Sequence, residues 1–221
     1  MTNEEILQGL FDNTLIGNAP EVKDLTNAGL EQDMSPESML YDALIPSLEE
    51  VGARFERGDF FVPEMLIAAR AMQGALDILR PLLAETGAQQ VGTYVMGTVK
   101  GDVHDIGKNI VAIMLKGSGF TVHDLGVNVA PEKFIEAINE FQPDVVGFSA
   151  FLTTTMPMFK ANINALEKAG MRDDVIVMVG GAPVTQEYAN AVGADGYASD
   201  ASAAVSRAKD LLARKRATAP A

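Results

Sequence analysis

The sequence predicts an α/β protein in which an N-terminal helical bundle is followed by a doubly wound, parallel sheet. Three observations lead to this prediction. The first 88 residues show helical periodicity and no strand pattern. In the rest of the chain, strand-like and helix-like runs alternate five times. The strand-like runs are apolar throughout, as expected for strands that helices cover on both faces.

The helical half, residues 1–88, is predicted to contain four or five helices with short connections, which together form a small bundle. Two amphipathic segments open it. A longer helix begins at Ser35-Pro36, where serine suits the N-cap and proline the first helical position. Pro46 predicts a kink or a local break within that helix. The last helix of this half begins at Val62-Pro63.

The second half, residues 89–221, follows a linker predicted at residues 86–89. The expected strands are 90–99, 121–125, 145–149, 175–179 and 196–198. The expected helices are 108–117, 131–140, 157–169, 185–191 and 201–214. Five strands alternating with five helices predict a Rossmann-like domain, with the flavodoxin-like strand order 2-1-3-4-5. The last residues, 214–221, are expected to form a frayed tail.

The composition limits the possible chemistry. The chain of 221 residues has no cysteine and only two histidines. Disulfides, cysteine-ligated zinc and thiolate-held iron–sulfur clusters are therefore excluded, as is a three-histidine site. A metal bound through one histidine must arrive with most of its coordination supplied, as in a macrocycle. No long apolar run or signal-peptide pattern is present, so we expect a soluble, cytoplasmic protein without membrane contact.

The charge is negative and unevenly distributed. The net charge is −13, and residues 1–88 carry 16 Asp and Glu against 5 Lys and Arg, a local net charge of −11. An acidic chain repels phosphate backbones, which weighs against nucleic-acid binding. The acidic half is expected to be a solvated helical surface, and it could also serve as a docking surface for partner proteins.

The most informative segment is Gly101-Asp102-Val103-His104-Asp105-Ile106-Gly107, between an expected strand and an expected helix. Such a turn lies at the carboxyl edge of the sheet, where α/β domains bind ligands. Asp102 can orient the His104 ring and leave its other nitrogen free for a metal, while Gly107 lets a bulky ligand approach. The ordinary alternative is a solvated histidine. His123, next to the end of a strand, is interpreted as structural.

Two further loops are expected at the same edge. Residues 149–155 contain Ser149, Leu152 and three threonines, and residues 180–183 contain Gly180 and Gly181. Strands one and three flank the topological switch point, so the first two loops should face one crevice. Each loop also has an ordinary interpretation, since the threonines could cap a helix and the glycines could form a tight turn.

Nucleotide binding is disfavoured by the same loops. The chain has neither a GxGxxG nor a Walker A sequence. An FMN-binding domain would need a phosphate loop rich in Ser and Thr after the first strand. Asp102, His104 and Asp105 occupy that place, and the carboxylates would repel a phosphate.

Residues 96–110 resemble the B12-binding signature of cobalamin-dependent methionine synthase and of the small corrinoid proteins of methyltransferase systems. The loops at 149–155 and 180–181 resemble the second and third motifs of the same family, in the same order. Residues 35–88, and especially 51–64, resemble its helical cap. The resemblance spans nearly the whole chain, and it implies a methyl cap at 1–88 and a cobalamin-binding domain at 89–221.

The resemblance also implies residue roles. His104 would be the lower axial ligand of cobalt, in the base-off/His-on mode, with Asp102 and Thr155 completing a His–Asp–hydroxyl relay. The cofactor-binding residues implied by the family motifs are Gly101, Asp102, Val103, His104, Asp105, Ile106, Gly107, Ser149, Leu152, Thr153, Gly180, Gly181 and Ala201. Phe151 stands where the family has Leu, which leaves the shape of that wall open. Apolar cap candidates are Phe60, Phe61, Val62, Met65 and Leu66.

The implied function is that of a corrinoid methyl carrier. Its cobalt would cycle through Co(I), Co(II) and Co(III), with methylcobalamin as the loaded form. The implied partners are a substrate-specific corrinoid methyltransferase, a second methyltransferase with a folate or thiol acceptor, and a reductive activase. Methylamines, betaines, methanol and methoxyaromatics are possible donors, and the chain is expected to be inactive alone. The alternative is a B12-binding sensor, although no basic DNA-binding segment is evident.

Overall fold

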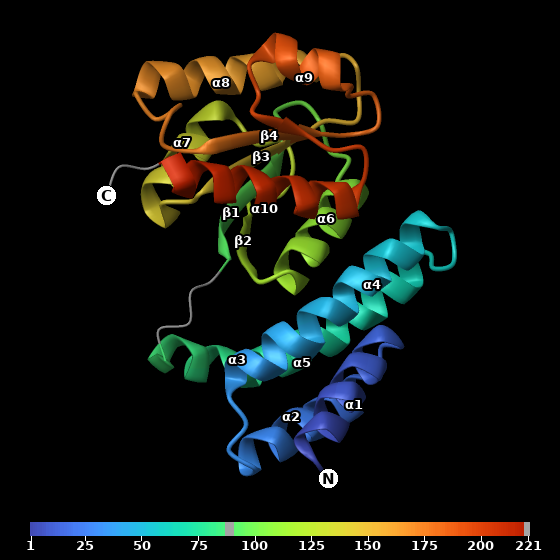
Figure 1. The fold of residues 1–221 in the computed structure, drawn as a ribbon. Coiled ribbons are helices and arrows are strands. Elements are labelled where there is room, and N and C mark those ends of the chain that lie inside the picture. Colours follow the sequence, from blue (N-terminus) through green and yellow to red (C-terminus); the bar gives the residue numbers. More distant parts are fainter. Residues whose placement is uncertain (87–90, 219–221) are drawn as a thin grey trace. The chain divides into compact units, whose positions relative to one another are not determined.

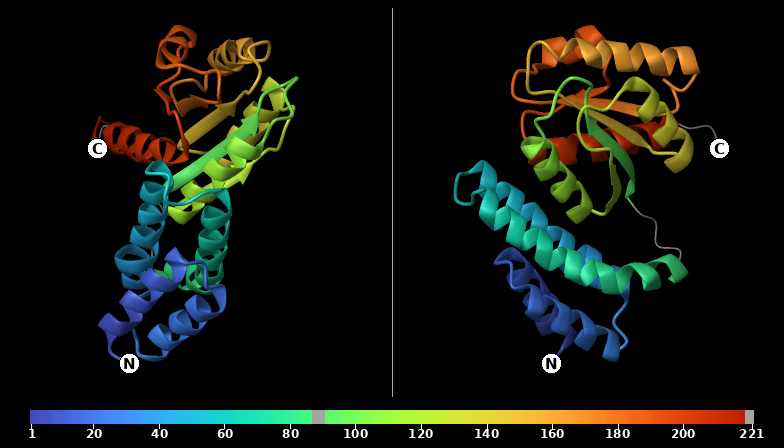
Figure 2. Two further views of the ribbon diagram at one scale, coloured as in Figure 1. Left: turned by 90° about the vertical axis from the view of Figure 1, so that its right-hand side faces the viewer. Right: turned by 180° about the vertical axis from the view of Figure 1, so that it is seen from behind.

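The computed structural model describes residues 1–86 and 91–218, which form a helical unit and an α/β unit. The two units are shown as ribbons in Figures 1 and 2. Apart from Thr86, the last helical residue, the linker predicted at 86–89 lies outside the described residues. No helix within the described ranges is both long enough and apolar enough to cross a membrane.

The helical unit is built from amphipathic helices around their own core. Its elements are α1 (Asn3–Leu15), α2 (Ala19–Glu31), α3 (Pro36–Ser38), η1 (Met39–Leu44), α4 (Ile45–Glu56) and α5 (Val62–Thr86). Thr2 and Glu5 form a reciprocal capping box at the start of α1. The buried side chains of the unit include Ile6, Leu10, Leu48, Met72 and Leu79.

The kink or local break expected at Pro46 corresponds to a π-helical stretch, η1, directly before α4. The N–H of Ile45 donates to the carbonyl of Leu40, five residues back, at the end of η1. Proline has no N–H to give to the carbonyl four residues back, and its ring would collide with that carbonyl. A wider turn just before Pro46 relieves both problems while the chain remains helical.

The α/β unit contains a five-stranded sheet in the order β2-β1-β3-β4-β5, and every pairing is parallel. Its strands are β1 (Gly92–Thr98), β2 (Phe120–Asp124), β3 (Val145–Ser149), β4 (Ile176–Gly180) and β5 (Gly196–Tyr197). Its helices are α6 (Ile106–Gly117), α7 (Pro131–Phe141), α8 (Pro157–Ala169), α9 (Gln186–Val192) and α10 (Ala201–Thr218). The predicted fold class and strand order are confirmed.

Helices cover both faces of this sheet. Side chains from α7, α8 and α9 share one buried cluster with the strands, which includes Phe134, Phe148 and Phe159. In Figure 1, α8 and α9 lie on one side of the strands, and α6 and α10 on the other. His123 on β2 stacks on Phe141, with ring centroids 3.8 Å apart, in agreement with a structural role.

The register of the sheet fixes where the loops begin. Thr98 pairs with Ser149, and Ser149 pairs with Gly180, so that β1, β3 and β4 end side by side. The loops that follow these strands therefore start from one edge. This is the arrangement that the sequence predicted for the candidate site.

The tail prediction was wrong in part, because α10 continues to Thr218; residues 219–221 lie outside the described ranges. The added turn has specific partners. Lys215 Nζ donates to the carbonyl of Asp174, and the Arg216 guanidinium lies 3.7 Å from the Asp144 carboxylate. The Thr218 hydroxyl donates back to the carbonyl of Arg214 at 3.1 Å.

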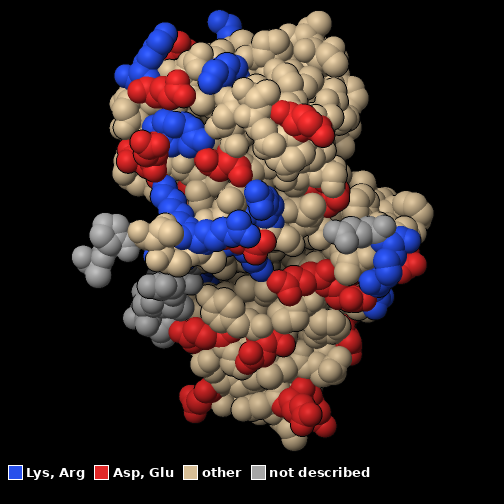
Figure 3. Space-filling model, turned by 45° about the horizontal axis from the view of Figure 1, so that its top comes forward, with Lys and Arg blue, Asp and Glu red and all other residues tan. Residues whose placement is uncertain are grey.

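Figure 3 shows one face of the molecule with its charged side chains. On this face Asp and Glu predominate over the helical unit, while Lys and Arg gather over the α/β unit. The picture agrees with the uneven charge of the sequence, in which residues 1–88 hold 16 of the 30 acidic residues and 5 of the 17 basic ones. The helical unit thus has an acidic, solvated surface.

Candidate functional site

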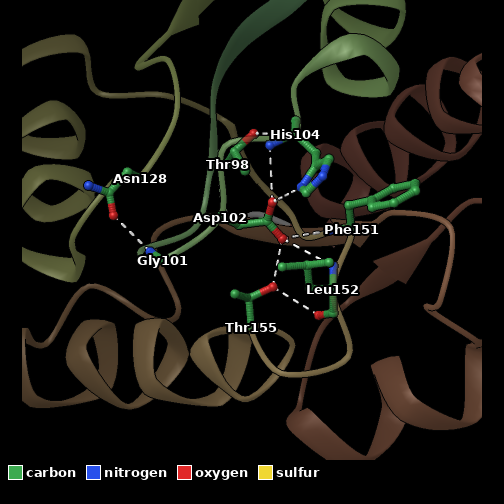
Figure 4. A network of polar contacts seen from close by, with 8 residues as sticks. All are labelled: Thr98, Gly101, Asp102, His104, Asn128, Phe151, Leu152 and Thr155. Carbon is green, nitrogen blue, oxygen red and sulfur yellow. Dashed lines mark hydrogen bonds and ion pairs between the residues drawn. The ribbon is translucent and has the colours of Figure 1, made fainter.

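The centre of the site is a histidine held by a buried aspartate (Figure 4). His104 lies in the loop between β1 and α6, and its Nδ1 is 2.7 Å from Asp102 Oδ1. The His104 main-chain N–H donates to the same oxygen at 3.1 Å. The Asp102 side chain is fully buried, whereas 45% of the His104 side chain is exposed. A buried anion therefore orients a ring that is open to a ligand.

The second carboxylate oxygen of Asp102 binds the loop after β3. It accepts hydrogen bonds from the N–H groups of Phe151 and Leu152, at 2.8 Å and 3.2 Å. It also accepts one from the Thr155 hydroxyl at 2.6 Å. The family resemblance implied the contact with Thr155, but not the two backbone donors. Every residue except proline has a main-chain N–H group, so the sequence does not single out these two.

These contacts decide the ionisation of Asp102. Burial by itself would raise the pKa of the Asp102 carboxyl group. Hydrogen bonds from Thr155, the His104 main chain and ring, and Phe151 outweigh burial and hold this pKa well below its ordinary value. An ionised carboxylate can only accept, so His104 Nδ1 carries the proton and Nε2 keeps a free lone pair.

The Thr155 hydroxyl has one proton and two acceptors within reach. Its Oγ1 lies 2.6 Å from Asp102 Oδ2 and 2.8 Å from the carbonyl of Leu152. A carboxylate is the stronger acceptor, so the proton is directed to Asp102. Thr155 is buried and makes the last link of the predicted His–Asp–hydroxyl chain.

The other predicted residues divide into two groups. Val103 in the β1–α6 loop and Ile106 at the start of α6 are exposed, and the Asp105 carboxylate accepts from Asn109 Nδ2 at 3.1 Å. Thr153 is exposed in the β3–α8 loop, and Ser149 ends β3. Ala201 is buried at the first position of α10, so its contribution to a cofactor slot stays a prediction.

Gly107 and Gly180 leave space that the protein itself does not fill. A Cβ added at either position would meet no atom within 4 Å, and neither has a φ in the left-handed region. Nothing in the described structure requires glycine there, so a ligand is the simplest reason for it. Gly181 differs, because its φ is +134° and a Cβ would lie 1.9 Å from the carbonyl oxygen of Ala150. Its glycine is required by the backbone itself.

The surface around His104 suits a large, largely apolar ligand. Val103, in the loop that carries the imidazole, is 67% exposed, and Ile106, the first residue of α6, is 75% exposed. The Phe151 ring, where a leucine was expected, stacks against the His104 ring with centroids 4.6 Å apart. Among the described residues, no group of three or more His, Asp or Glu side chains could hold a metal. A metal bound by His104 would thus bring its other ligands, as a corrin does.

The apolar candidates of the helical unit are not alike. Met65 is buried in the core of that unit. Phe61 and Leu66 are exposed, which leaves them free to contact another surface. Their role as a methyl cap stays a prediction.

Sequence reasoning missed three polar residues that support the β1–α6 loop. The Thr98 hydroxyl donates to the carbonyl of His104 at 3.1 Å. Asn128 Oδ1 accepts from the Gly101 N–H at 2.8 Å. Lys108, whose side chain is 1% exposed, pairs with Asp124 at the end of β2. The sequence offered only weak signals for these contacts, since Asn128 lies in a short turn and Lys108 directly follows the motif.

Comparison with known protein families agrees with this geometry. Residues 92–206 match a model described as a B12 binding domain, and residues 6–80 match a second model with the same description. The two matches fall on the α/β unit and the helical unit. Fold and site together define the class of B12-binding proteins.

Individual relatives indicate which B12-binding proteins the chain is similar to in sequence and structure. Dimethylamine corrinoid protein 1 of Methanosarcina acetivorans is 42% identical over 217 residues, which covers 96% of this chain and 100% of that protein. The methanol:cobalamin methyltransferase complex of Methanosarcina barkeri aligns over 96% of this chain and 81% of its own, with 28% identity and a TM-score of 0.83. A cobalamin-binding protein from Desulfitobacterium hafniense aligns over 95% and 98%, with 28% identity and a TM-score of 0.76. The chain therefore belongs to the B12-binding corrinoid proteins of methyltransferase systems.

Replacement of Asp102 by Asn should lower stability in a pH-dependent way. At about pH 7 we expect the free energy of unfolding to fall by about 1–3 kcal/mol, since buried donors lose a charged acceptor. The folded-state pKa of Asp102 is lowered. Its contribution is therefore present above the ordinary carboxyl pKa of about 3.9 and is lost as the pH falls below it.

Urea unfolding of both proteins at about pH 7 and about pH 3 measures this difference, which should shrink at the lower pH. Asp12→Asn, at an exposed carboxylate on α1, is the control and should show little change at either pH. An equal loss for Asp102→Asn at both pH values would contradict the assignment of an ionised, stabilising carboxylate.

Proposed function

We propose that the protein is a methyl carrier of a methylamine-dependent methyltransferase system, with His104 as the axial ligand of a base-off corrinoid. One observation carries the proposal: an exposed imidazole has its Nδ1 fixed at 2.7 Å by a buried carboxylate, which leaves Nε2 free. Where a histidine binds a metal, the group that is hydrogen-bonded to its other ring nitrogen orients the ring and raises the basicity of the nitrogen that binds the metal.

The residues present fit the cofactor. His104 would hold the metal, Val103 and Ile106 would contact the apolar macrocycle, and Gly107 and Gly180 leave room for its approach. When bound, a corrinoid supplies a cobalt ion that accepts a methyl group in the Co(I) state and releases it from Co(III). The remaining predicted slot residues, Ser149, Thr153, Gly181 and Ala201, belong to this proposal as contacts of the nucleotide tail.

The contribution of the chain's own residues is to orient and to hold protons. Asp102 stays ionised and keeps one proton on His104 Nδ1. Thr155 donates to the carboxylate from the other side. The chain of hydrogen bonds therefore holds the Nδ1 proton of His104 against a fixed negative charge.

The proposed donor is a methylamine, because relatives over 40% identical across nearly the whole chain are dimethylamine corrinoid proteins. Among the methylamines, dimethylamine is the first to test. A separate methyltransferase would load the carrier and a second one, with a folate or thiol acceptor, would unload it. A reductive activase would restore the reduced cobalt, and the compartment would be the cytoplasm.

The His104 assignment can be tested by labelling. Cobalamin-loaded protein with ¹⁵N-histidine, reduced to Co(II), should show a doublet in electron paramagnetic resonance where unlabelled protein shows a triplet, because the ligand nitrogen is the protein's. Cobalamin's own benzimidazole would stay a triplet. His104→Ala should abolish the labelled doublet.

His123→Phe is the matched control, since it preserves a ring against Phe141. It should retain the doublet. A triplet in labelled wild-type protein would show that His104 is not the ligand.

Substitutions at the neighbouring Gly180 and Gly181 should distinguish an effect on cofactor uptake from an effect on folding. Gly180→Ala places a methyl group in open space, so stability should stay within about 0.5 kcal/mol of wild type while cobalamin affinity drops. Gly181→Ala should cost at least about 2 kcal/mol of stability, because of its backbone clash and its φ. Thermal unfolding and cobalamin titration measure the two effects. Full affinity in a folded Gly180→Ala protein would refute the placement of the ligand beside β4.

Methyl transfer should depend on a partner. Reduced, cobalamin-loaded protein mixed with dimethylamine alone should show no spectral change, because the described residues hold no cluster of three or more His, Asp or Glu side chains that could bind a second metal and activate the amine. Addition of a dimethylamine-specific corrinoid methyltransferase should start the reaction, and methanol should not replace the amine. Rapid methylation without a partner would show a complete enzyme, whereas cobalamin binding without any redox cycling would favour the sensor interpretation.

A further inference from the structure

The loop between β2 and α7 is hydrogen-bonded to the main chain of the loop that contains His104. Asn128 Oδ1 accepts a hydrogen bond from the Gly101 N–H at 2.8 Å, as Figure 4 shows. The Asn128 N–H donates to the carbonyl of Asp102 at 2.9 Å. One residue therefore binds the main chain on both sides of the Cα atom that carries the carboxylate.

The backbone of both loops is shaped for this contact. Gly101 has a φ of +84° and Asn128 a φ of +54°, both in the left-handed region. Glycine adopts that region freely, and asparagine tolerates it better than most residues. The side chain of Asn128 thus folds back onto a neighbouring turn whose N–H would otherwise depend on solvent.

A second set of contacts joins α6, the end of β2 and the β2–α7 loop. The buried ammonium group of Lys108 pairs with Asp124, and the second oxygen of Asp124 accepts from the Gly126 N–H at 2.9 Å. The carbonyl of Gly126 accepts from the Thr98 N–H at 2.9 Å. The β2–α7 loop is therefore hydrogen-bonded to β1 directly, and it is linked to α6 through Asp124 at the end of β2.

Two separate sets of contacts therefore hold Asp102 in place, one on its carboxylate and one on its main chain. Its carboxylate is bound by the β3–α8 loop, through Phe151, Leu152 and Thr155. Its main chain is bound by Asn128. The carboxylate fixes the His104 ring, so a shift of the Asp102 main chain shifts the ring as well.

We infer that Asn128 is a positioning residue for His104, which sets the metal ligation by this imidazole without touching it. The ligation half of this inference rests on the proposed function; the orientation of His104 by Asn128 does not. Loss of the side-chain contact loosens the Gly101–Asp102 turn, and the His104 ring then spends less time in the orientation that binds metal.

The test uses a variant that keeps the backbone conformation. Asn128→Gly removes Oδ1 but retains the left-handed φ and the N–H bond to Asp102. Asn128→Asp retains an acceptor oxygen and should restore the wild-type behaviour. Gln142→Gly is the matched control, because Gln142 also has a left-handed φ, of +46°, and caps α7 away from the loop.

Two measurements on the full-length protein separate orientation from ligation. In the apoprotein, hydrogen exchange of the His104 Nδ1–H, followed by ¹⁵N–¹H nuclear magnetic resonance, should be about five-fold faster in Asn128→Gly, as expected for the loss of one hydrogen bond. In the cobalamin-loaded Co(II) protein, the fraction with a ¹⁵N-histidine doublet should fall. Gln142→Gly and Asn128→Asp should match wild type in both.

The outcomes are distinct. Unchanged exchange in Asn128→Gly, or equal acceleration in Gln142→Gly, would overturn the positioning role. Faster exchange with an unchanged doublet would overturn its control of ligation. If wild-type protein itself shows no histidine doublet, the proposed ligand is wrong, while the exchange measurement still decides whether Asn128 orients His104.

Discussion

The site depends on one constraint, which is that the buried carboxylate of Asp102 must be fully satisfied. A buried charge without partners would cost several kcal/mol, so its partners have to be fixed in place. Five donated hydrogen bonds satisfy it, two from His104 and three from the loop after β3. The interaction that orients the imidazole is thus also the one that joins the loops after β1 and β3. His104 is therefore oriented because the fold has to supply hydrogen-bond donors to a buried anion.

The rest of the α/β unit supplies the geometry for this interaction. Parallel pairing of β1, β3 and β4 brings Thr98, Ser149 and Gly180 into one row, and the loops begin there. Above the buried anion the surface is apolar. Val103 and Ile106 stay exposed, and full burial of such a side chain stabilises by about 1.5–3 kcal/mol. A ligand that covers them would gain part of this energy, so binding can draw on apolar contact as well as on the imidazole.

Much of this could be predicted from sequence because the patterns concerned are local or periodic. The alternation of apolar runs and helical runs predicted the strand order, and the Asp-x-His-x-x-Gly spacing predicted the contact of Asp102 with His104. Other features depend on distant atoms. The N–H groups of Phe151 and Leu152 carry no signature of their own, and the contact of Asn128 with Gly101 joins residues 27 positions apart. Gly181 could be recognised as special but not explained, since its clash is with the backbone of Ala150. The extension of α10 to Thr218 relies on tertiary partners at Asp144 and Asp174.

The low pKa of Asp102 also limits how the relay can work. A carboxylate that shared the proton with the imidazole would change its own charge as the axial bond formed, and the five donors around it would have to rearrange. Hydrogen bonds from Thr155, His104 and Phe151 prevent this by holding the pKa well below its ordinary range. The anion is then constant, and of the two imidazole nitrogens only Nε2 is left free for a ligand. The buried half of the site can therefore keep its hydrogen bonds while a ligand binds at the exposed edge of the imidazole. Under the proposed function this division has an advantage, because a partner protein would act on an accessible face and would not have to disturb the buried polar network.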